Sequence, residues 1–184
     1  MSESEAKKQR AFFAIVPDET VRKHLLSLQK QLKKKFPSEK VRWITPENLH
    51  LTLKFLGPID HSQLSCVINR AKDLQIPSIK LYFDQLGMFR KSGICWLGCQ
   101  NDAQALIELQ HVLAKKTSEC GLIPEKRKFS PHITLARKFN ASLVGVKTQT
   151  IEWPVTNIQL MVSKQTNEGV YYQTLETFSS NDVL

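Results

Sequence analysis

The sequence predicts an α+β fold of two pseudo-symmetric lobes. Runs of short strand patterns are broken by two or three helical patterns, which favours α+β over a doubly wound parallel sheet. A shift of 82 residues places the patterns of the first half onto those of the second. The 184 residues, 41% of them apolar, suffice for a single domain over residues 1–184.

The first half opens with a strand pattern and a helix pattern. The apolar run RAFFAIVP at residues 10–17 is typical of a buried strand, and Asp18 stands where a helix N-cap is expected. The helix then carries apolar residues at helical spacing, namely Val21, Leu25, Leu28 and Leu32. After it, LHLTLKF at residues 49–55 has the two-residue period of a half-buried strand.

The second half repeats this order. Residues 92–99, SGICWLGC, predict a strand, and Asp102 is placed as the N-cap of the next helix. That helix carries Leu106, Leu109, Val112 and Leu113. The other elements that we expect are a turn at Gly57-Pro58, a helix over 61–74, a strand over 79–83, an irregular stretch over 140–150, and a hairpin of strands 157–163 and 170–178.

A histidine and a threonine two residues apart occur in a strand pattern of each half. His50 and Thr52 lie in NLHLTLKFLG, and His132 and Thr134 lie in SPHITLARKF. Strict alternation puts His50, Thr52 and Lys54 on one face of the first strand. The opposite face takes the apolar residues, namely Leu49, Leu51, Leu53 and Phe55. Exposed strand residues are the ordinary interpretation, since threonine is a good strand former. The repeat favours an acid and base pair, with one histidine from each lobe.

The net charge of +9, from 26 Lys and Arg against 17 Asp and Glu, indicates an anionic partner. Lys40 and Arg42 precede the first motif, and basic residues at 126–128 and 137–138 surround the second. A basic rim of this kind attracts phosphate, whereas the run at 33–35 is explained by a helix end, where cations are favoured. Aromatic residues in strands are usually core, but four near the motifs are candidates for stacking on a base, namely Trp43, Phe55, Phe129 and Phe139.

The N-terminus and the cysteines bear on the cellular compartment. Residues 1–9 are polar and expected to be flexible, and the apolar run after them is too short for a signal peptide or a membrane span. We therefore expect a cytoplasmic monomer without membrane contact. Its four cysteines, Cys66, Cys95, Cys99 and Cys120, are expected to be reduced thiols. Their spacing does not match a zinc site, so we expect neither a metal nor a cofactor.

Two histidines, two threonines and a basic rim suit the hydrolysis of a phosphodiester at a ribose. The reaction needs a base for water and an acid for the leaving alkoxide, and a histidine with a pKa near ~6.5 serves as either. Threonine hydroxyls would hydrogen-bond the non-bridging oxygens, where charge develops. A 2′,3′-cyclic phosphate fits well, because its strained ring already holds the leaving oxygen in place. The same groups suit the reverse reaction, which joins a 5′-hydroxyl to a cyclic phosphate.

NLHLTLKFLG and SPHITLAR resemble the two signature motifs of the 2H phosphoesterase superfamily, and RAFFAIVP with LHLTLKFLG is similar to the bacterial RNA 2′,3′-cyclic phosphodiesterases, also called 2′-5′ RNA ligases. The resemblance covers nearly the whole chain and implies a bilobal fold with two antiparallel-rich sheets around a central cleft and helices on the outside. It implies metal-independent hydrolysis of RNA 2′,3′-cyclic phosphate ends to 2′-phosphomonoesters, and reverse 2′-5′ ligation of tRNA halves. By motif position it implies that His50 is the proton donor and His132 the proton acceptor. It also implies phosphate contacts from Thr52, Thr134 and Arg137.

Arg137 does not follow the simple strand pattern. Its parity places it with Ile133 and Leu135 rather than with His132, so the strand must end or bulge near Ala136 for Arg137 to reach the phosphate. The remaining histidines lie in helical patterns without a partner motif and are expected to be surface or hydrogen-bonded residues; they are His24, His61 and His111.

Two other functions stay open at this point. The chain is alternatively a non-catalytic RNA- or nucleotide-binding module on the same fold, which needs the basic rim but not both histidines. It is also compatible with a 2H enzyme that acts on other RNA ends or on small cyclic nucleotides. Turnover in the presence of a chelator, followed by analysis of the products, separates these hypotheses.

Overall fold

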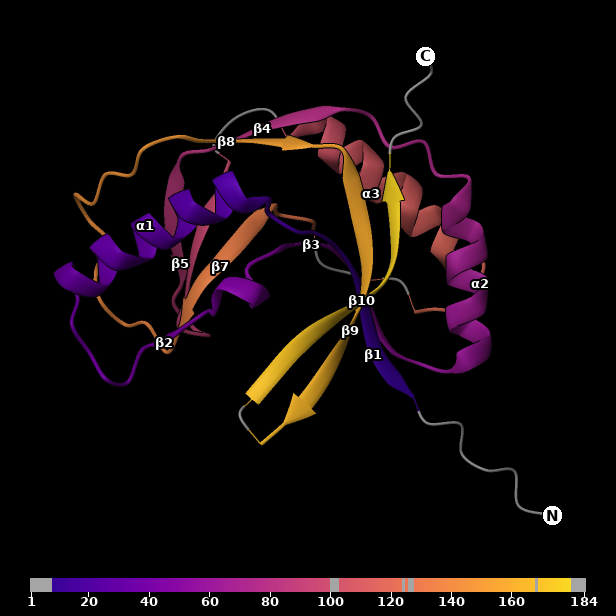
Figure 1. The fold of residues 1–184 in the computed structure, drawn as a ribbon, viewed down its shortest axis with the longest axis horizontal. Coiled ribbons are helices and arrows are strands. Elements are labelled where there is room, and N and C mark those ends of the chain that lie inside the picture. Colours follow the sequence, from indigo (N-terminus) through magenta and orange to yellow (C-terminus); the bar gives the residue numbers. More distant parts are fainter. Residues whose placement is uncertain (1–7, 100–102, 124, 126–127, 168, 180–184) are drawn as a thin grey trace.

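The computed structural model describes residues 8–99, 103–123, 125, 128–167 and 169–179 (Figure 1). In chain order, the elements of this described part are β1 (Gln9–Ile15), α1 (Glu19–Lys35), β2 (Arg42–Trp43), the 3-10 helix η1 (Pro46–Asn48), β3 (Leu51–Ile59), α2 (His61–Lys72), β4 (Ile79–Phe83), β5 (Gln85–Phe89), β6 (Ile94–Gly98), α3 (Gln104–Ser118), β7 (His132–Arg137), β8 (Ile151–Val155), β9 (Asn157–Thr166) and β10 (Gly169–Ser179). The predicted mixed architecture with antiparallel sheets is confirmed.

The contact between β3 and β7 divides the main sheet into two halves. The main sheet runs β10-β9-β1-β3-β7-β6-β5, with β2 also paired to β7. β3 and β7 meet at one residue pair, Leu51 opposite Ile133, so the half-sheet of β1, β3 and β9 joins the half-sheet of β5, β6 and β7 there. A second, two-stranded sheet pairs β4 with β8. Each motif strand therefore lies at the inner edge of its own half-sheet.

The helices cover the half-sheets from outside the cleft. The predicted N-cap of α1 is confirmed, because the Asp18 carboxylate accepts a hydrogen bond of 2.8 Å from the Val21 amide. α1 lies over the half-sheet of β7, while α2 and α3 lie side by side on the other lobe (Figure 1). The expected helix over 61–74 is α2, which ends at Lys72. The residue predicted to cap α3, Asp102, lies outside the described residues.

A continuous apolar core lies between the helices and the sheets. The predicted apolar face of α1 is buried in it, as are Leu51 and Ile133 from the motif strands. A second, smaller buried cluster of Phe12, Ala14 and Met161 lies apart from that core, with Tyr172 packed against it. β1 is consequently buried on both faces, which explains why its sequence is an unbroken apolar run rather than an alternating one.

The strict alternation expected along the first motif strand is wrong beyond Thr52. Along β3, Ala14 pairs with Thr52 and Phe13 with Lys54, so Leu53 is an extra residue in the pairing with β1. This β-bulge inverts the side-chain parity. Lys54 is therefore buried beside Leu53, whereas Phe55 is 55% exposed instead of facing the core. Burial lowers the pKa of the Lys54 ammonium, and the Glu125 carboxylate opposes this effect.

The turn expected at Gly57-Pro58 is wrong. Gly57 and Pro58 are not a turn but belong to β3, opposite Ala11 and Arg10, and Gly57 has a φ of 77° that favours glycine. The strands β2, β5 and β8 were not predicted. Residues 1–7 of the segment 1–9, expected to be flexible, lie outside the described residues, and β1 begins at Gln9.

Within the described chain, no helix has both the length and the apolar character needed to cross a membrane.

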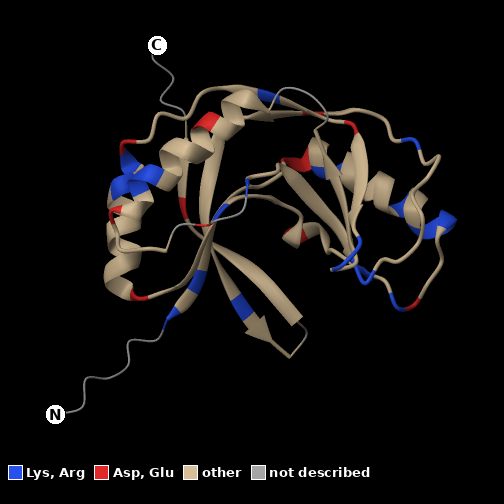
Figure 2. Cartoon of the chain, turned by 180° about the vertical axis from the view of Figure 1, so that it is seen from behind, with Lys and Arg blue, Asp and Glu red and all other residues tan. Residues whose placement is uncertain are grey.

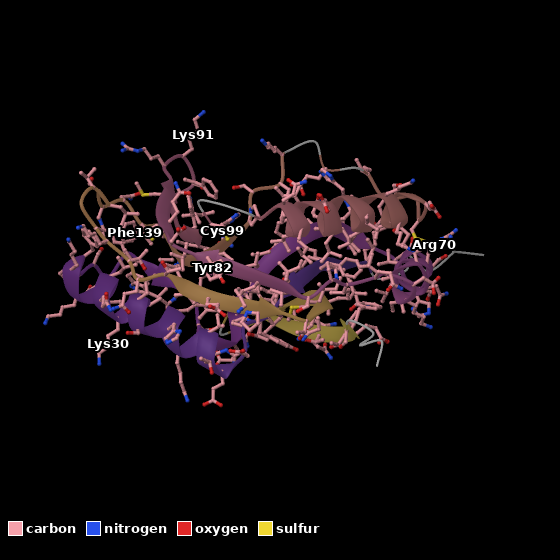
Figure 3. All side chains as sticks on the ribbon, turned by 90° about the horizontal axis from the view of Figure 1, so that it is seen from above. Lys30, Arg70, Tyr82, Lys91, Cys99 and Phe139 are labelled. Carbon is pink, nitrogen blue, oxygen red and sulfur yellow. A yellow bond between two sulfur atoms is a disulfide. The ribbon has the colours of Figure 1, made fainter. Side chains whose placement is uncertain are left out.

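The expectation of four reduced thiols is wrong for one pair. Cys66 of α2 and Cys120, just beyond α3, form a disulfide with a Cα–Cα distance of 5.8 Å. The packing of α2 against α3 brings these residues together, and the ion pair of Arg70 with Glu119 links the same two segments (Figure 3). Cys95 and Cys99 are free, and burial raises their pKa values to about 12 and about 11.

Candidate active site

The pairing of β3 with β7 brings the two His-x-Thr motifs together. Leu51 and Ile133 are directly opposite each other and fully buried on the core side. Their sequence neighbours at positions 50, 52, 132 and 134 therefore face the opposite side of the sheet. Opposed side chains in an antiparallel pair lie about 4.5–5.5 Å apart at Cβ. The sequence-predicted histidines and threonines thus converge on one face of the sheet, opposite the core.

Both histidine rings are held in the same way by the backbone two residues earlier. The Nδ1–H of His50 donates to the Asn48 carbonyl at 2.6 Å, and that of His132 donates to the Ser130 carbonyl at 2.7 Å. A carbonyl only accepts, so the proton of each neutral ring is on Nδ1. Nε2 of each neutral ring then carries the lone pair. The Thr52 hydroxyl lies 3.1 Å from Nε2 of His50.

Aromatic side chains frame each imidazole. The His50 ring lies 4.9 Å from Tyr172 in an edge-on arrangement and 5.2 Å from Phe12. The His132 ring lies 5.1 Å from Phe89, also edge-on, and 6.4 Å from Trp96. Trp96 has room because it crosses Gly87, where a Cβ atom would stand only 2.2 Å from the indole ring. These contacts fix the ring planes and exclude water from one side of each histidine.

Arg137 reaches the histidine face through a bulge like the one in β3. Thr134 pairs with Trp96 and Ala136 pairs with Cys95, which leaves Leu135 as the extra residue of β7. Leu135 and Ala136 are both buried, and Arg137 is exposed. The bulge that the sequence required near Ala136 is therefore present, and it gives Arg137 the parity of Thr134. The pairing of Arg42 with Arg137 places a second guanidinium beside the first.

The chain matches the model of the LigT like Phosphoesterase family twice, over residues 15–96 and 97–172. The chain belongs to this family. The two matches begin 82 residues apart, which is also the spacing of the two histidines. Two curated relatives are both called RNA 2′,3′-cyclic phosphodiesterase. That of Escherichia coli strain K12 is 32% identical, over 93% of this chain and 96% of the relative. That of Methanocaldococcus jannaschii is 30% identical, over 91% and 98%.

A solved structure shows the same likeness. The crystal structure of E. coli LigT complexed with 3′-AMP has a TM-score of 0.86 and 28% sequence identity to this LigT-like phosphoesterase. The match covers 95% of this chain and 99% of the other. The fold described above is thus the fold of the family.

The electrostatics of the LigT-like site distinguish its two histidines. Burial lowers the pKa of His50 below its ordinary value of 6.5, and the nearby charges of Arg137 and His132 lower it further. The hydrogen bond to the Asn48 carbonyl opposes this shift. In the free protein His50 is therefore neutral at pH 7. That Arg137 and His132 both act on His50 indicates that the three side chains share one site.

The other sequence candidates are spread over the molecule. Phe139 is fully buried against Phe36 and Trp43, so it is a core residue of this LigT-like chain. Trp43 is half-buried beneath Lys33. Phe129 is half-buried and lines a small cavity together with Lys54. The remaining histidines, His24, His61 and His111, are exposed on helices. Lys126 and Arg127 lie outside the described residues. No group of three or more His, Cys, Asp or Glu within the described ranges could hold a metal ion.

Several residues of the site were not identified from the sequence. Asn48 holds the His50 ring through its carbonyl, and its side-chain amide donates to the Val170 carbonyl at 2.8 Å, which ties the hairpin of β9 and β10 to the site. Phe12, Phe89 and Trp96 stand beside the histidines but occur in strand patterns that also suit core residues. The two adjacent aromatics of β1 enter different buried clusters: Phe13 lies in the main core, and Phe12 lies in the smaller cluster beside His50.

Proposed function

We propose that the protein hydrolyses RNA 2′,3′-cyclic phosphate ends to 2′-phosphomonoesters without a metal ion, with His50 and His132 as its acid and base. The observation that carries this proposal is the matched pair of imidazoles on adjacent strands, each with Nδ1 bonded to a carbonyl. Two such groups are what an in-line displacement at phosphorus requires. The names of the curated relatives support the same substrate class.

The geometry suggests a role for each group. Water attacks phosphorus opposite O3′, and Nε2 of His132 takes a proton from that water. The bond between phosphorus and O3′ breaks, and Nε2 of His50 gives its proton to the departing O3′. The product carries a phosphate on O2′ and a hydroxyl at C3′. Thr52, Thr134 and Arg137 bind the non-bridging oxygens, where negative charge grows in the transition state.

The lowered pKa of His50 constrains this assignment. An acid must carry its proton when the reaction starts, yet burial and Arg137 keep His50 neutral in the free protein. A bound phosphate anion beside Nε2 favours the protonated ring. We therefore expect substrate binding to be accompanied by uptake of one proton at His50. The ring then leaves the reaction neutral, while His132 leaves it protonated, and exchange with solvent restores both.

Reverse ligation is the second part of this proposal. If the 5′-hydroxyl of another RNA attacks phosphorus in place of water, His132 takes the proton of that hydroxyl, the bond between phosphorus and O3′ breaks and His50 protonates O3′. Two strands, such as tRNA halves, are then joined through a 2′-5′ bond. A small nucleotide is also a candidate substrate, because the related E. coli LigT has been crystallised with 3′-AMP. An RNA end and a small nucleotide differ as substrates only in what is attached to the reacting ribose.

The test is incubation of the purified protein with an oligoribonucleotide ending in a 2′,3′-cyclic phosphate, in excess chelator. Phosphorus NMR identifies the product, and the proposal requires a 2′-phosphate. His50→Ala and His132→Ala should each reduce the rate by about 10²–10⁴-fold. His111→Ala, at an exposed histidine of α3, is the matched control and should leave the rate unchanged. Full activity of both motif variants, or complete loss with the chelator, would refute the proposed mechanism.

A further inference from the structure

A basic pocket lies at the end of β7 that is remote from the histidines. It encloses about 500 Å³, and we call it the turn pocket, because the turn between β5 and β6 forms one wall. Its charged lining residues are Lys40, Arg42, Arg90, Lys91, Lys138 and Glu39. Figure 2 shows Lys and Arg gathered at the loops of the lobe that carries α1, and Figure 3 shows Lys91 projecting away from the ribbon.

The walls of the turn pocket are held by the backbone. Ser92 and Gly93 donate to the carbonyls of Phe89 and Arg90, which closes the turn between β5 and β6. The Phe139 amide donates to the Gly93 carbonyl at 2.9 Å, so the turn is fixed against the end of β7. Lys138 adopts a φ of 54°, a left-handed conformation that is rare for a residue with a long side chain. That conformation lets Phe139 enter the core while Lys138 stays exposed.

The charge of the turn pocket is poorly balanced within the protein. Five exposed cations surround it, against the single carboxylate of Glu39. In the described part of the chain, none of these cations takes part in an ion pair. Like charges held this close repel each other, and an anion between them relieves that repulsion. None of the described lining residues is aromatic, so the turn pocket suits phosphate groups rather than a stacked base.

The paired strands β2 and β7 lead from the turn pocket to the candidate active site. Arg42 lines the pocket and pairs with Arg137, which in turn acts on His50. β7 runs from His132 to Arg137, next to the pocket residue Lys138, and its five steps span roughly 17 Å at the usual rise of a strand. A nucleotide bound at the histidines does not extend that far, but a strand of several nucleotides does.

We propose that the turn pocket binds backbone phosphates of the RNA strand on the 5′ side of the reacting end. This inference rests on the proposed function, because a terminal 2′,3′-cyclic phosphate leaves the rest of the strand on its 5′ side only. The protein then recognises its substrate at two places. Arg137 and the motifs hold the reacting phosphate, and the turn pocket holds phosphates several nucleotides away. The consequence is a preference for RNA over mononucleotides.

The test compares two substrates in one double variant, Arg90→Gln/Lys91→Gln. The substrates are a nucleoside 2′,3′-cyclic phosphate and a cyclic-phosphate oligoribonucleotide of about ten nucleotides, within the site sizes of single-strand-binding folds. The variant should keep the wild-type kcat/KM on the mononucleotide. On the oligonucleotide kcat/KM should fall on the order of tenfold at low salt, and its slope against salt on logarithmic axes should weaken by about 1.4. Lys72→Gln/Lys115→Gln, on the other lobe, is the control with the same change in net charge.

Direct binding separates this inference from the proposed function. Fluorescence anisotropy with an unreactive oligoribonucleotide ending in a 3′-hydroxyl measures affinity whether or not the protein is catalytic. Weaker binding in Arg90→Gln/Lys91→Gln, but not in the control, supports the turn pocket even if turnover is absent. Equal losses on both substrates, or an unchanged affinity and salt slope for the oligonucleotide, would overturn it.

Discussion

Replacement of Gln29 by methionine should weaken both the fold and phosphate binding, because Gln29 supports the bulge that turns Arg137 toward the histidines. Gln29 is 2% exposed, and its Nε2 donates at 2.9 Å to the carbonyls of both Leu135 and Ile44. The Ile44 amide also donates to the Leu135 carbonyl, at 3.0 Å. In Gln29→Met the Ile44 carbonyl therefore loses its hydrogen bond from Gln29. The Leu135 carbonyl loses the same donor but keeps the hydrogen bond from the Ile44 amide. A buried acceptor without a partner costs about 1–3 kcal/mol and a lost hydrogen bond about 1, so we expect about 2–4 kcal/mol.

Urea unfolding followed by tryptophan fluorescence gives that difference, provided that the m-value is unchanged. The control is Lys30→Met, at the next and exposed position of α1 (Figure 3), which should stay within about 0.5 kcal/mol of wild type. In the folded variant, KM for a cyclic phosphate should rise, and combination with Arg137→Gln should add little further loss. Wild-type stability in Gln29→Met, or additive effects of the two substitutions on KM, would refute the role assigned to Gln29.

Three further predictions concern the site and the disulfide. If His50 is the acid, kcat/KM should fall as pH rises through a pKa below 6.5, since the free protein loses the competent proton there, and an NMR titration of the imidazole should give the same value. Arg137→Gln should lower kcat/KM on the order of a hundredfold. It should also move the fall of kcat/KM to higher pH, because a cation that repels the protonated His50 ring is removed; an unchanged pH dependence would contradict the assignment of His50 as the acid. Cys66→Ser/Cys120→Ser should cost about 4 kcal/mol of unfolding free energy, from the entropy of a loop spanning 54 residues, and reductant should destabilise wild type equally. If the urea midpoint of the wild-type protein is the same with and without reductant, the disulfide does not stabilise the fold as predicted.

The sequence was most informative where local chemistry decides the structure. The Asp18 cap and the buried face of α1 follow from residue type and spacing. Prediction from the sequence failed where the structure depends on pairing between segments that are distant in the chain. A bulge is defined by the partner strand, so nothing in LHLTLKF indicates that Leu53 is the extra residue or that Phe55 turns outward. The disulfide likewise depends on the contact of α2 with α3, which no spacing of cysteines reveals.

The two bulges give direction to a site that is otherwise symmetrical. Leu53 and Leu135 are 82 residues apart, and each is the extra residue directly after a His-x-Thr motif. Each bulge turns the residue two positions later toward the cleft: Phe55 in one lobe, which lies 6.1 Å from Phe12, and Arg137 in the other. The same backbone device therefore presents an apolar ring on one side and a cation on the other. A terminal nucleotide is itself unsymmetrical, with an anionic phosphate and a flat base. One orientation matches both sides at once, and it would decide which histidine lies next to O3′.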